Sequence, residues 1–545
     1  MISADALLVA ALALPLAMLA ACVSPAARAR MPPLLALAPA PALAAAFLAP
    51  GGASLVLVLL PPPLRTTLTL DRPGAILLGS TALLWIVAGA YAAVSLRGRP
   101  DTGRFAEWWL LTLSGSLGVF MAADLVSFYL TYSIVSLAGW GLVVHDGDAA
   151  SRRAGGVYLA LAVLGEALLL MAFVFMAEAV PSGSLAIRDV VAALPAAPWR
   201  DAALALLLLG FGLKIGLAPG HVWMPLAYTA APIPAAAVLS GAAVKAGVIG
   251  LIRFLPFGTA MPGWGEALAA AGLFSAFYGV AIGVTQDNPK TVLAYSSVSQ
   301  MGLLAAALGM GWAAGDSGAV TSVSFAAAHH VLVKGALFLA IGVAAASRPR
   351  LWPVLLPAVV LALGLGGLPL TGGALAKLAL KPELGQGFAG ALAALAAAGS
   401  ILLMLHFLRH LAALPGRAPE RAAPARLTAL WLVAAFASLA LPWLLFPLAG
   451  TGARLDALAP AALWAGVWPV LVGAAIAAGL QRSGWRPPRV PPGDIVVAGE
   501  AAFRAAAKGA DAVERLDETL RRWPVACLSL MVLAVLLAAA LWAQR

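Results

Sequence analysis

Four lysines lie where the chain is otherwise apolar enough to reach the interior of a lipid bilayer. These are Lys214, Lys245, Lys334 and Lys377, whereas the arginines fall in loops or at the ends of apolar stretches. Arginine stays protonated in proteins, but a lysine withdrawn from water can gain and lose a proton near neutrality. Ionisable groups within membrane spans are costly and are functional candidates. The pattern therefore favours proton transfer over fixed charge.

Other ionisable residues accompany these lysines. His330 and Lys334 are four residues apart, so they share one helix face. Glu166 lies mid-span and is the strongest acidic candidate; its carboxylate would hold a buried Lys214 protonated until the pair weakens. His221, beside Trp223, fits a proton relay or an interfacial anchor equally well.

Each of these residues also has a purely structural interpretation. A lysine can extend its ammonium to the membrane surface, and His330 and Lys334 can each simply make one buried polar contact. The apolar or small residues around Lys245, for about two helical turns on each side, make the first interpretation difficult for that lysine. We therefore expect a functional role for the set.

Composition predicts the element type that positions these residues. The chain is 62% hydrophobic and 10% charged, with a mean hydropathy of +0.96, while soluble domains are about one-quarter charged. A spanning helix needs about 20 apolar residues. Counting such stretches predicts an all-α, polytopic membrane protein of roughly sixteen transmembrane helices. The expected spans are 6–23, 31–49, 75–96, 107–125, 126–144, 155–180, 201–218, 230–254, 265–286, 291–311, 319–346, 352–384, 389–410, 427–449, 460–480 and 523–542.

Two of these spans are interrupted close to a lysine. The seventh contains Lys214 and is followed by Pro219–Gly220; the twelfth contains a Gly- and Pro-rich break from 366 to 373 ahead of Lys377. Broken helices are tolerated in membranes where the opened backbone lines a hydrated cavity, and they mark ion paths in transporters. We expect two broken helices on the path.

The basic residues predict an orientation. The net charge of +11 comes largely from arginine-rich loops on one side of the membrane, which the positive-inside rule makes cytoplasmic. Both termini then face outward across a bacterial inner membrane. The first segment ends in a lipoprotein-like Leu19–Cys22 stretch, but its start lacks a basic residue, so we expect a retained helix. An amphipathic surface helix is expected at about 496–522.

The sequence predicts no cofactor or metal. Its two cysteines, Cys22 and Cys527, cannot form an iron–sulfur or thiolate zinc site. His406 and His410 lie one turn apart on one helix, and His329 and His330 are adjacent, so neither pair can sandwich a haem. No nucleophile constellation or nucleotide loop occurs, which argues against an enzyme acting alone.

Several motifs closely resemble the antiporter-like membrane subunits shared by respiratory complex I, Mrp-type cation/proton antiporters and membrane-bound hydrogenases. The resemblance covers roughly 100–410 and implies two inverted five-helix repeats, spans four to eight and nine to thirteen. It also implies N-terminal helices at 1–106, a translocation core at 107–410 and C-terminal helices at 411–545. The matching stretches are 212–225, 231–234, 240–253, 287–302, 330–334 and 368–377.

The resemblance implies a role for each matching residue. Lys214 corresponds to the lysine of the first broken helix, Lys245 to the central lysine, and Lys377 to the exit-side charge of the second broken helix. His330 and Lys334 correspond to the polar bridge between half-channels. The family usually has a glutamate in the fifth helix where this chain has Ser133. Either Glu166 in the sixth span replaces this glutamate, or this copy does not pump protons.

The leading functional interpretation is a proton-translocating subunit, with cation/proton exchange as one option, of a complex I-like, Mrp-type or membrane-bound hydrogenase complex. Its partners would be other membrane subunits, lipid, protons and Na⁺ or K⁺, with no nucleic acid. One alternative is a non-conducting scaffold, motivated by Ser133. Another, from the resemblance alone, is the membrane subunit of an inorganic-carbon uptake complex.

Overall fold

The computed structural model describes 4–48, 54–57, 66–347, 352–385, 387–414, 424–448, 450, 452–484, 488–497, 499–500 and 502. Contacts between Cα atoms divide the chain into two units, 1–492 and 493–545. The expected span at 523–542, with Cys527, and most of the expected surface helix at 496–522 lie outside the described residues.

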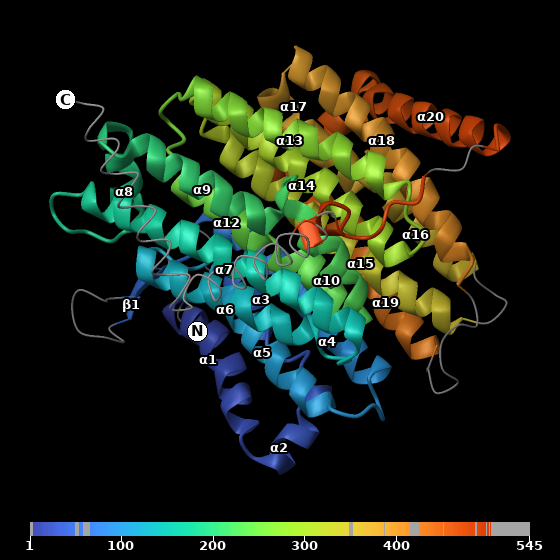
Figure 1. The fold of residues 1–545 in the computed structure, drawn as a ribbon, viewed down its shortest axis with the longest axis horizontal. Helices are drawn as coiled ribbons and strands as arrows, with labels where there is room; N and C mark the ends of the chain where they lie inside the picture. The colour runs from blue at the N-terminus through green and yellow to red at the C-terminus, as the bar shows by residue number, and fades with distance from the viewer. Residues whose placement is uncertain are drawn as a thin grey trace, which may run out of the picture. The chain divides into compact units, whose positions relative to one another are not determined.

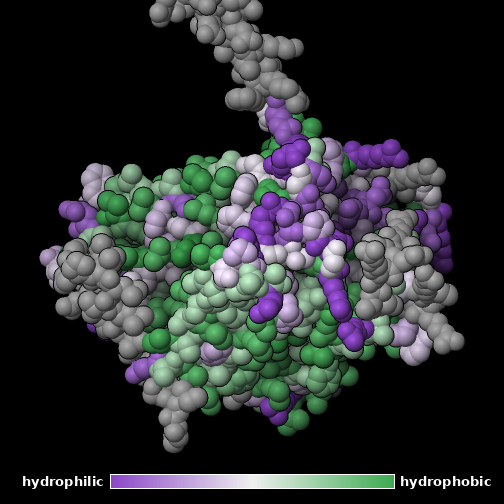
Figure 2. Space-filling model, turned by 90° about the horizontal axis from the view of Figure 1, so that it is seen from below, coloured by the Kyte–Doolittle hydropathy of each residue, from purple (hydrophilic) through white to green (hydrophobic). Residues whose placement is uncertain are grey.

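The described part is almost entirely helical, as expected from the composition. Eleven of its helical segments are long and apolar enough to cross a membrane. Large apolar side chains remain exposed on the outward faces of several of them, including Leu164 and Val174 on one helix and Trp464 and Leu471 on another. Figure 2 shows broad apolar areas over much of one face, interrupted by polar patches. Apolar surface on this scale is what lipid or neighbouring membrane subunits cover.

The N-terminal part differs from the expectation at one span. Residues 31–49 do not form one helix, because four prolines in this stretch remove backbone donors and restrict φ. A hairpin that the sequence analysis did not anticipate follows it. The elements here are α1 (Ala4–Ala21), α2 (Pro25–Arg30), η1 (Pro32–Leu34), α3 (Ala40–Leu48), β1 (Ser54–Leu57), β2 (Thr66–Thr69), α4 (Arg72–Ser95) and α5 (Thr102–Gly118).

The hairpin is antiparallel and pairs Ser54 with Thr69 and Leu57 with Thr66. Strand β2 also contacts the turn after α5, where Thr69 N donates to the Met121 carbonyl. The backbone amide of Thr67 donates to Asp124, which also caps the next helix through Ser127 N. Asp124 is thus the N-cap of α6 (Leu125–Val143).

The central helices follow the expected spans to within a few residues. Figure 1 shows them as a bundle in which α13 and α14 lie side by side and α15 lies next to α14. The elements are α6 (Leu125–Val143), α7 (Ala149–Glu178), α8 (Ile187–Ala193), η2 (Leu194–Ala196), α9 (Arg200–Ile215), η3 (Gly220–Val222), α10 (Trp223–Ala230), α11 (Ile233–Val238), the π-helical turn η4 (Leu239–Ala243), α12 (Lys245–Phe254), α13 (Pro262–Gly283), α14 (Pro289–Ala314) and α15 (Gly318–Ala346).

The remaining elements include the second break. They are α16 (Trp352–Leu365), α17 (Gly372–Leu384), α18 (Phe388–Ala412), α19 (Pro424–Leu448), η5 (Arg454–Leu458) and α20 (Pro460–Arg482). The segment between α16 and α17 is the Gly- and Pro-rich stretch identified in the sequence. Both expected breaks are therefore present, one between α9 and α10 and one between α16 and α17.

A ladder of glycines brings α13 and α14 into direct backbone contact. Gly265, Gly272 and Gly279 recur every seven residues on α13. Gly265 faces Gly309 and Gly272 faces Gly302 on α14, while Gly279 faces the backbone of Tyr295 and Ser299. A Cβ on Gly272 would lie 2.5 Å from the Gly302 carbonyl oxygen and 2.6 Å from the Ala306 nitrogen. Small residues permit this approach, which is how helices gain packing energy in lipid. The ladder fixes α14, which supplies several polar groups to the site.

Candidate functional site

The first broken helix places Lys214 one residue before the end of α9. Gly216 adopts φ 73°, and Leu217 N donates to the Gly212 carbonyl at 2.9 Å, which closes the helix in a Schellman-type turn. The Trp223 indole donates to the Leu213 carbonyl at 2.8 Å, so a side chain of α10 satisfies a group that the break frees. The break thus fixes the backbone on both sides of Lys214.

The Lys214 ammonium lies inside the bundle. Its side chain is buried, and Nζ donates to Ser136 Oγ at 2.7 Å and lies 5.4 Å from the centre of the Tyr132 ring. A cavity of about 20 Å³ adjoins it, enough for one water molecule. The cavity is lined by Tyr132, Ser136, Tyr158, Leu161, Ala162, Gly165, Gly210, Leu213, Lys214 and Trp223.

Glu166 lies near Lys214 but does not form the expected direct pair. The two charges interact electrostatically, yet among the described residues no ion pair within 4.0 Å joins them. Glu166 is buried beside Ser133, and its Oε1 has no hydrogen-bond partner in the protein. Ser133 and Ser136 lie three residues apart on α6, so Glu166 and Lys214 are offset by about one helical turn.

Close packing of α7 against α9 explains why Glu166 lies near Lys214. Gly165 and Gly210 let α7 and α9 meet, since a Cβ on Gly210 would lie 3.1 Å from the Gly165 carbonyl oxygen. On the opposite side, Gly247 of α12 packs on Lys214, with a built Cβ 3.0 Å from the lysine Cβ. Among the described residues no hydrogen bond links Lys214 to Lys245, so packing alone joins these two positions.

Lys245 and His330 form a buried pair in the middle of the bundle. Lys245 Nζ lies 2.6 Å from His330 Nδ1, and both side chains are buried. At this distance one nitrogen must accept: either the ammonium donates to a neutral imidazole, or the ring N–H donates to a neutral amine. The pair therefore holds a shared proton in one of two places, which is the arrangement that proton transfer needs.

A second polar branch begins at Lys334, one turn after His330 on α15. Its Nζ donates to the Leu293 carbonyl at 2.9 Å, and Ser297 Oγ donates to the same oxygen at 3.2 Å. Ser297 also lies 3.0 Å from Ser240 Oγ in the π-helical turn η4. A π turn of this kind frequently occurs at functional sites, and this one directly precedes Lys245. The two serines thus connect α14 to the turn that presents Lys245.

The second broken helix holds Lys377 beside another cavity. The Lys377 ammonium donates to the Gly366 carbonyl at the end of α16, where the helix dipole favours a cation. The cavity measures about 50 Å³, room for a few water molecules. It is lined by Gln300, Leu303, Leu304, Ala326, His329, His330, Leu365, Gly373, Ala376, Lys377, Leu380 and Ala397.

This second cavity joins two groups that the sequence placed on one path. His330 Nε2 and both ring nitrogens of His329 are buried without a protein hydrogen-bond partner. His329 and His330 line the same cavity as Lys377. Lys377 and His330 therefore line one cavity, and His330 contacts Lys245, so the cavity and one hydrogen bond connect these three residues. Lys334 acts electrostatically on Lys245 at the inner end of this series.

His221 lies in the first break, between α9 and α10. It is fully buried, with its ring 4.9 Å from the Tyr278 ring and 5.9 Å from the Tyr295 ring, and it lines neither of the two cavities above. Burial among aromatic rings distinguishes it from a residue at the membrane surface, so the interfacial interpretation is not supported.

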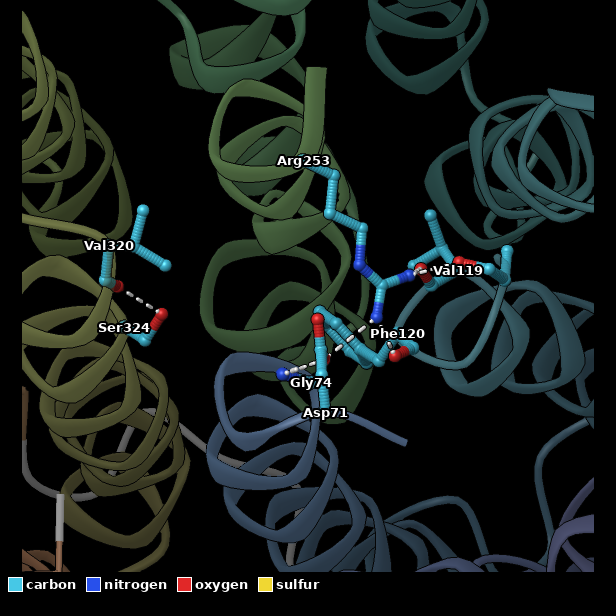
Figure 3. A network of polar contacts seen from close by, with 8 residues as sticks. Asp71, Gly74, Val119, Phe120, Arg253, Val320 and Ser324 are labelled. Atoms are coloured by element: carbon cyan, nitrogen blue, oxygen red, sulfur yellow. Dashed lines mark hydrogen bonds and ion pairs between the residues drawn. The ribbon is translucent and has the colours of Figure 1, made fainter. Parts of the chain in front are cut away.

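An arginine anchors the far end of α12, the helix that begins at Lys245. Figure 3 shows Arg253 extending to Asp71 and to the carbonyl groups of Val119 and Phe120. The ion pair to Asp71 measures 3.1 Å, and Asp71 in turn caps α4 through Gly74 N. This cation also satisfies carbonyl groups just after the end of α5. The network ties together the ends of α4, α5 and α12.

Several polar residues of the site have no role assigned from the sequence, although three of them, Ser240, Ser297 and Gln300, lie within the stretches that resemble the family. Ser136, Ser240, Ser297 and Gln300 are buried or partly buried polar residues within apolar helices, a type that is usually only structural. The signal for Ser136 was its position three residues after Ser133, on the same face of α6. His329 was visible in the sequence, but only as a neighbour of His330.

The sequence matches known proteins through this same region. Residues 122–405 match the family described as NADH:quinone oxidoreductase/Mrp antiporter, TM. Hydrogenase-4 component B of Escherichia coli (strain K12) is 31% identical over 291 residues, which cover 51% of this chain and 43% of the relative. NADH-quinone oxidoreductase subunit N of Cereibacter sphaeroides is 34% identical over 347 residues, covering 60% and 73%.

The fold also matches a solved structure. A chain in the structure of the Mrp complex from Dietzia sp. DQ12-45-1b superposes with a TM-score of 0.75 at 24% sequence identity, covering 99% of this chain and 63% of that one. At this identity the match shows the fold alone. The chain spans about half the length of several of the curated relatives it matches.

Proposed function

Because the chain belongs to the NADH:quinone oxidoreductase/Mrp antiporter transmembrane family, we propose that it translocates protons as one membrane subunit of a larger complex. The observation that carries this proposal is the series from Lys377 through the 50 Å³ cavity to His330 and Lys245. Groups that can each hold or release a proton are spaced there by one hydrogen bond or by a cavity large enough for water.

The proposal assigns each residue a step. Lys214, with its single-water cavity and Glu166 nearby, forms one half of the path; Lys245, His330 and Lys334 form the centre; Lys377 forms the other half. Protons move when the charge state of one group changes the stability of the charge on the next. His221, buried between the halves of the first broken helix, is proposed as an accessory relay.

The finer architecture belongs to the same proposal. We infer about sixteen membrane-crossing segments of about 20 residues each, the interrupted stretch at 31–49 counted among them. We also infer two inverted five-helix repeats and a translocation core at 107–410. The arginine-rich loops support a cytoplasmic face at that side of a bacterial inner membrane, with both termini outside. The partners would be other membrane subunits of a complex I-like, Mrp-type or hydrogenase complex, and exchange of Na⁺ or K⁺ for protons would be one mode of action.

One observation favours a competing function. Lys214 contacts Ser136 rather than a carboxylate, and the family glutamate position is occupied by Ser133. A subunit without a tight lysine–carboxylate pair could serve as a non-conducting scaffold. Glu166 distinguishes the two functions, because its buried charge affects activity only if protons move along the path.

Reconstituted complex tests the proposal directly. Lys214→Ala, Lys245→Ala and Lys377→Ala should each lower proton flux by about a hundredfold, because each removes one proton-holding group. Lys381→Ala, an exposed lysine on the same helix as Lys377, should keep the flux of the unmodified complex. Subunit content is measured alongside. Normal flux in all three variants contradicts the proposal, and normal flux in Glu166→Gln favours the scaffold.

A further inference from the structure

Glu383 is a buried carboxylate that neither the broken helices nor the lysine series explains. It lies on the last turn of α17, two residues after the exposed Lys381, with a relative exposure of only 8%. Its Oε2 has no hydrogen-bond partner in the protein. An ionisable group buried in this way is costly unless something uses it.

On each of three helices, residues that line the Lys377 cavity are followed along the same face by residues near Glu383. On α17 the cavity is lined by Ala376 and Leu380, and Glu383 follows at the next positions of that face, seven and three residues later. The distance from Leu380 to Glu383 along the helix axis is about 4.5 Å. Glu383 therefore lies about one helical turn beyond the end of the cavity.

The neighbouring helices show the same continuation. On α15 the cavity residues His329 and Ala326 are followed along that face by Ser322, which lies beside Glu383. On α14 the cavity residue Leu304 is followed seven residues later by Gly311, where a built Cβ would lie 3.6 Å from Glu383 Cγ. The cavity and the carboxylate thus share one seam between α14, α15 and α17.

Beyond Glu383 the seam reaches the turn between α14 and α15, since a Cβ built on Gly311 would lie 3.6 Å from both Glu383 Cγ and the Asp316 carbonyl oxygen. Asp316, which is exposed in the turn between α14 and α15, is the other charged residue that acts on Glu383. In the sequence, the arginines at 348 and 350 come after the other end of α15, which ends at Ala346. Glu383 consequently lies between the Lys377 cavity and the turn that joins α14 to α15, which the positive-inside rule assigns to the outer side.

From this geometry we propose that Glu383 is the terminal proton-carrying residue of the path, between the Lys377 cavity and water at the outer surface. The inference rests on the proposed function and adds the site of proton exchange with the outside. In outward transfer the Glu383 carboxylate accepts the proton that Lys377 releases through the cavity and becomes a carboxylic acid, while Lys377 becomes a neutral amine. Glu383 then gives the proton to water and regains its charge; inward transfer reverses both steps.

The test measures proton flux in proteoliposomes that hold the complete complex, as a function of the pH on the Asp316 side. Unmodified complex should lose outward flux as that side is acidified, because a protonated Glu383 cannot accept another proton. Glu383→Gln should lower flux by roughly tenfold or more and remove this pH dependence, and Glu383→Asp should restore part of both. Glu266→Gln, an exposed carboxylate at the start of α13, is the matched control and should behave like the unmodified complex.

The outcomes separate this inference from the proposed function. If Lys377→Ala abolishes flux but Glu383→Gln leaves flux and its pH dependence unchanged, the terminal role is wrong and the lysine path stands. An equal loss at every pH that Glu383→Asp does not relieve also contradicts the role, since it indicates a structural residue. If neither Lys377→Ala nor Glu383→Gln alters flux, the proposed function itself fails.

Discussion

The charge states of single residues determine what this site can do. Lys245 and His330 at 2.6 Å cannot both be protonated at the contact, so one proton serves two nitrogens. Lys214 has a different arrangement, in which a hydroxyl accepts from the ammonium and the nearest carboxylate, that of Glu166, is offset. A hydroxyl stabilises the ammonium less than a carboxylate would, which leaves Lys214 able to change charge state without breaking a tight ion pair.

Replacing Ser136 tests this arrangement. Ser136→Ala removes the acceptor of the Lys214 ammonium, and an unsatisfied buried donor costs about 1–3 kcal/mol. We expect a flux reduction of roughly tenfold, because about 1.4 kcal/mol is a factor of ten in an equilibrium. Ser136→Thr keeps a hydroxyl and should retain most of the flux. Equal flux in the alanine and threonine variants would show that the Ser136 contact is irrelevant to transfer.

At the scale of elements, the breaks and close contacts of helices place these groups. The α9 break ends in a glycine-closed turn next to Lys214, and the α16 break leaves a carbonyl for Lys377. The glycine ladder positions α14, whose Leu293 carbonyl, Ser297 and Gln300 all face the path. A change that separates α13 from α14 should therefore disturb chemistry that is far from the ladder.

Gly272→Ala is the sharpest test of the ladder. The added methyl would meet backbone atoms of Gly302 and Ala306, which cannot rotate away, so the helices must separate. We expect a loss of about 1–3 kcal/mol in unfolding free energy, typical of overpacking, read as a lower unfolding temperature in detergent. Gly156→Ala, on α7 with no atom near its built Cβ, is the control and should be neutral or stabilising. An unchanged unfolding temperature for Gly272→Ala would contradict the close contact.

The helices and both breaks could be predicted from apolar length and from glycine and proline, because those features act locally. The lysines were visible for the same reason: charge within an apolar stretch is a local anomaly. Contacts between distant segments were not predictable, which is why the expected Glu166–Lys214 pair is instead a Ser136–Lys214 hydrogen bond. The π turn before Lys245 and the two cavities depend on packing between helices, and Glu383 stood out only once three helices were seen to share a seam.

At the scale of the whole molecule, the orientation of the bundle decides which end of the path faces the cytoplasm. The turn before α7 and the turn before α15 lie at opposite ends. Helix α14 connects the two turns. Asp146, close to Ala150 in the turn before α7, interacts electrostatically with Lys290 at the start of α14, and Ser317 in the turn before α15 follows the end of α14. The length of α14, 26 residues, separates its ends by about 39 Å. The positive-inside rule assigns the Ala150 end to the cytoplasm because arginines 152 and 153 follow it.

Cysteine labelling from one side of the membrane decides this orientation. In a chain whose two native cysteines are replaced by serine, Ala150→Cys and Ser317→Cys each introduce one exposed thiol outside the apolar core. A membrane-impermeant maleimide added to intact cells should label Ser317→Cys, while Ala150→Cys should react only after the cells are opened. Labelling of Ala150→Cys in intact cells would invert the topology and place Glu383 at the cytoplasmic end. That result would also exchange the entry and exit sides of the proton path. The residues of the path and their order would stay the same, because the seam, the cavities and the lysine series depend only on contacts within the bundle.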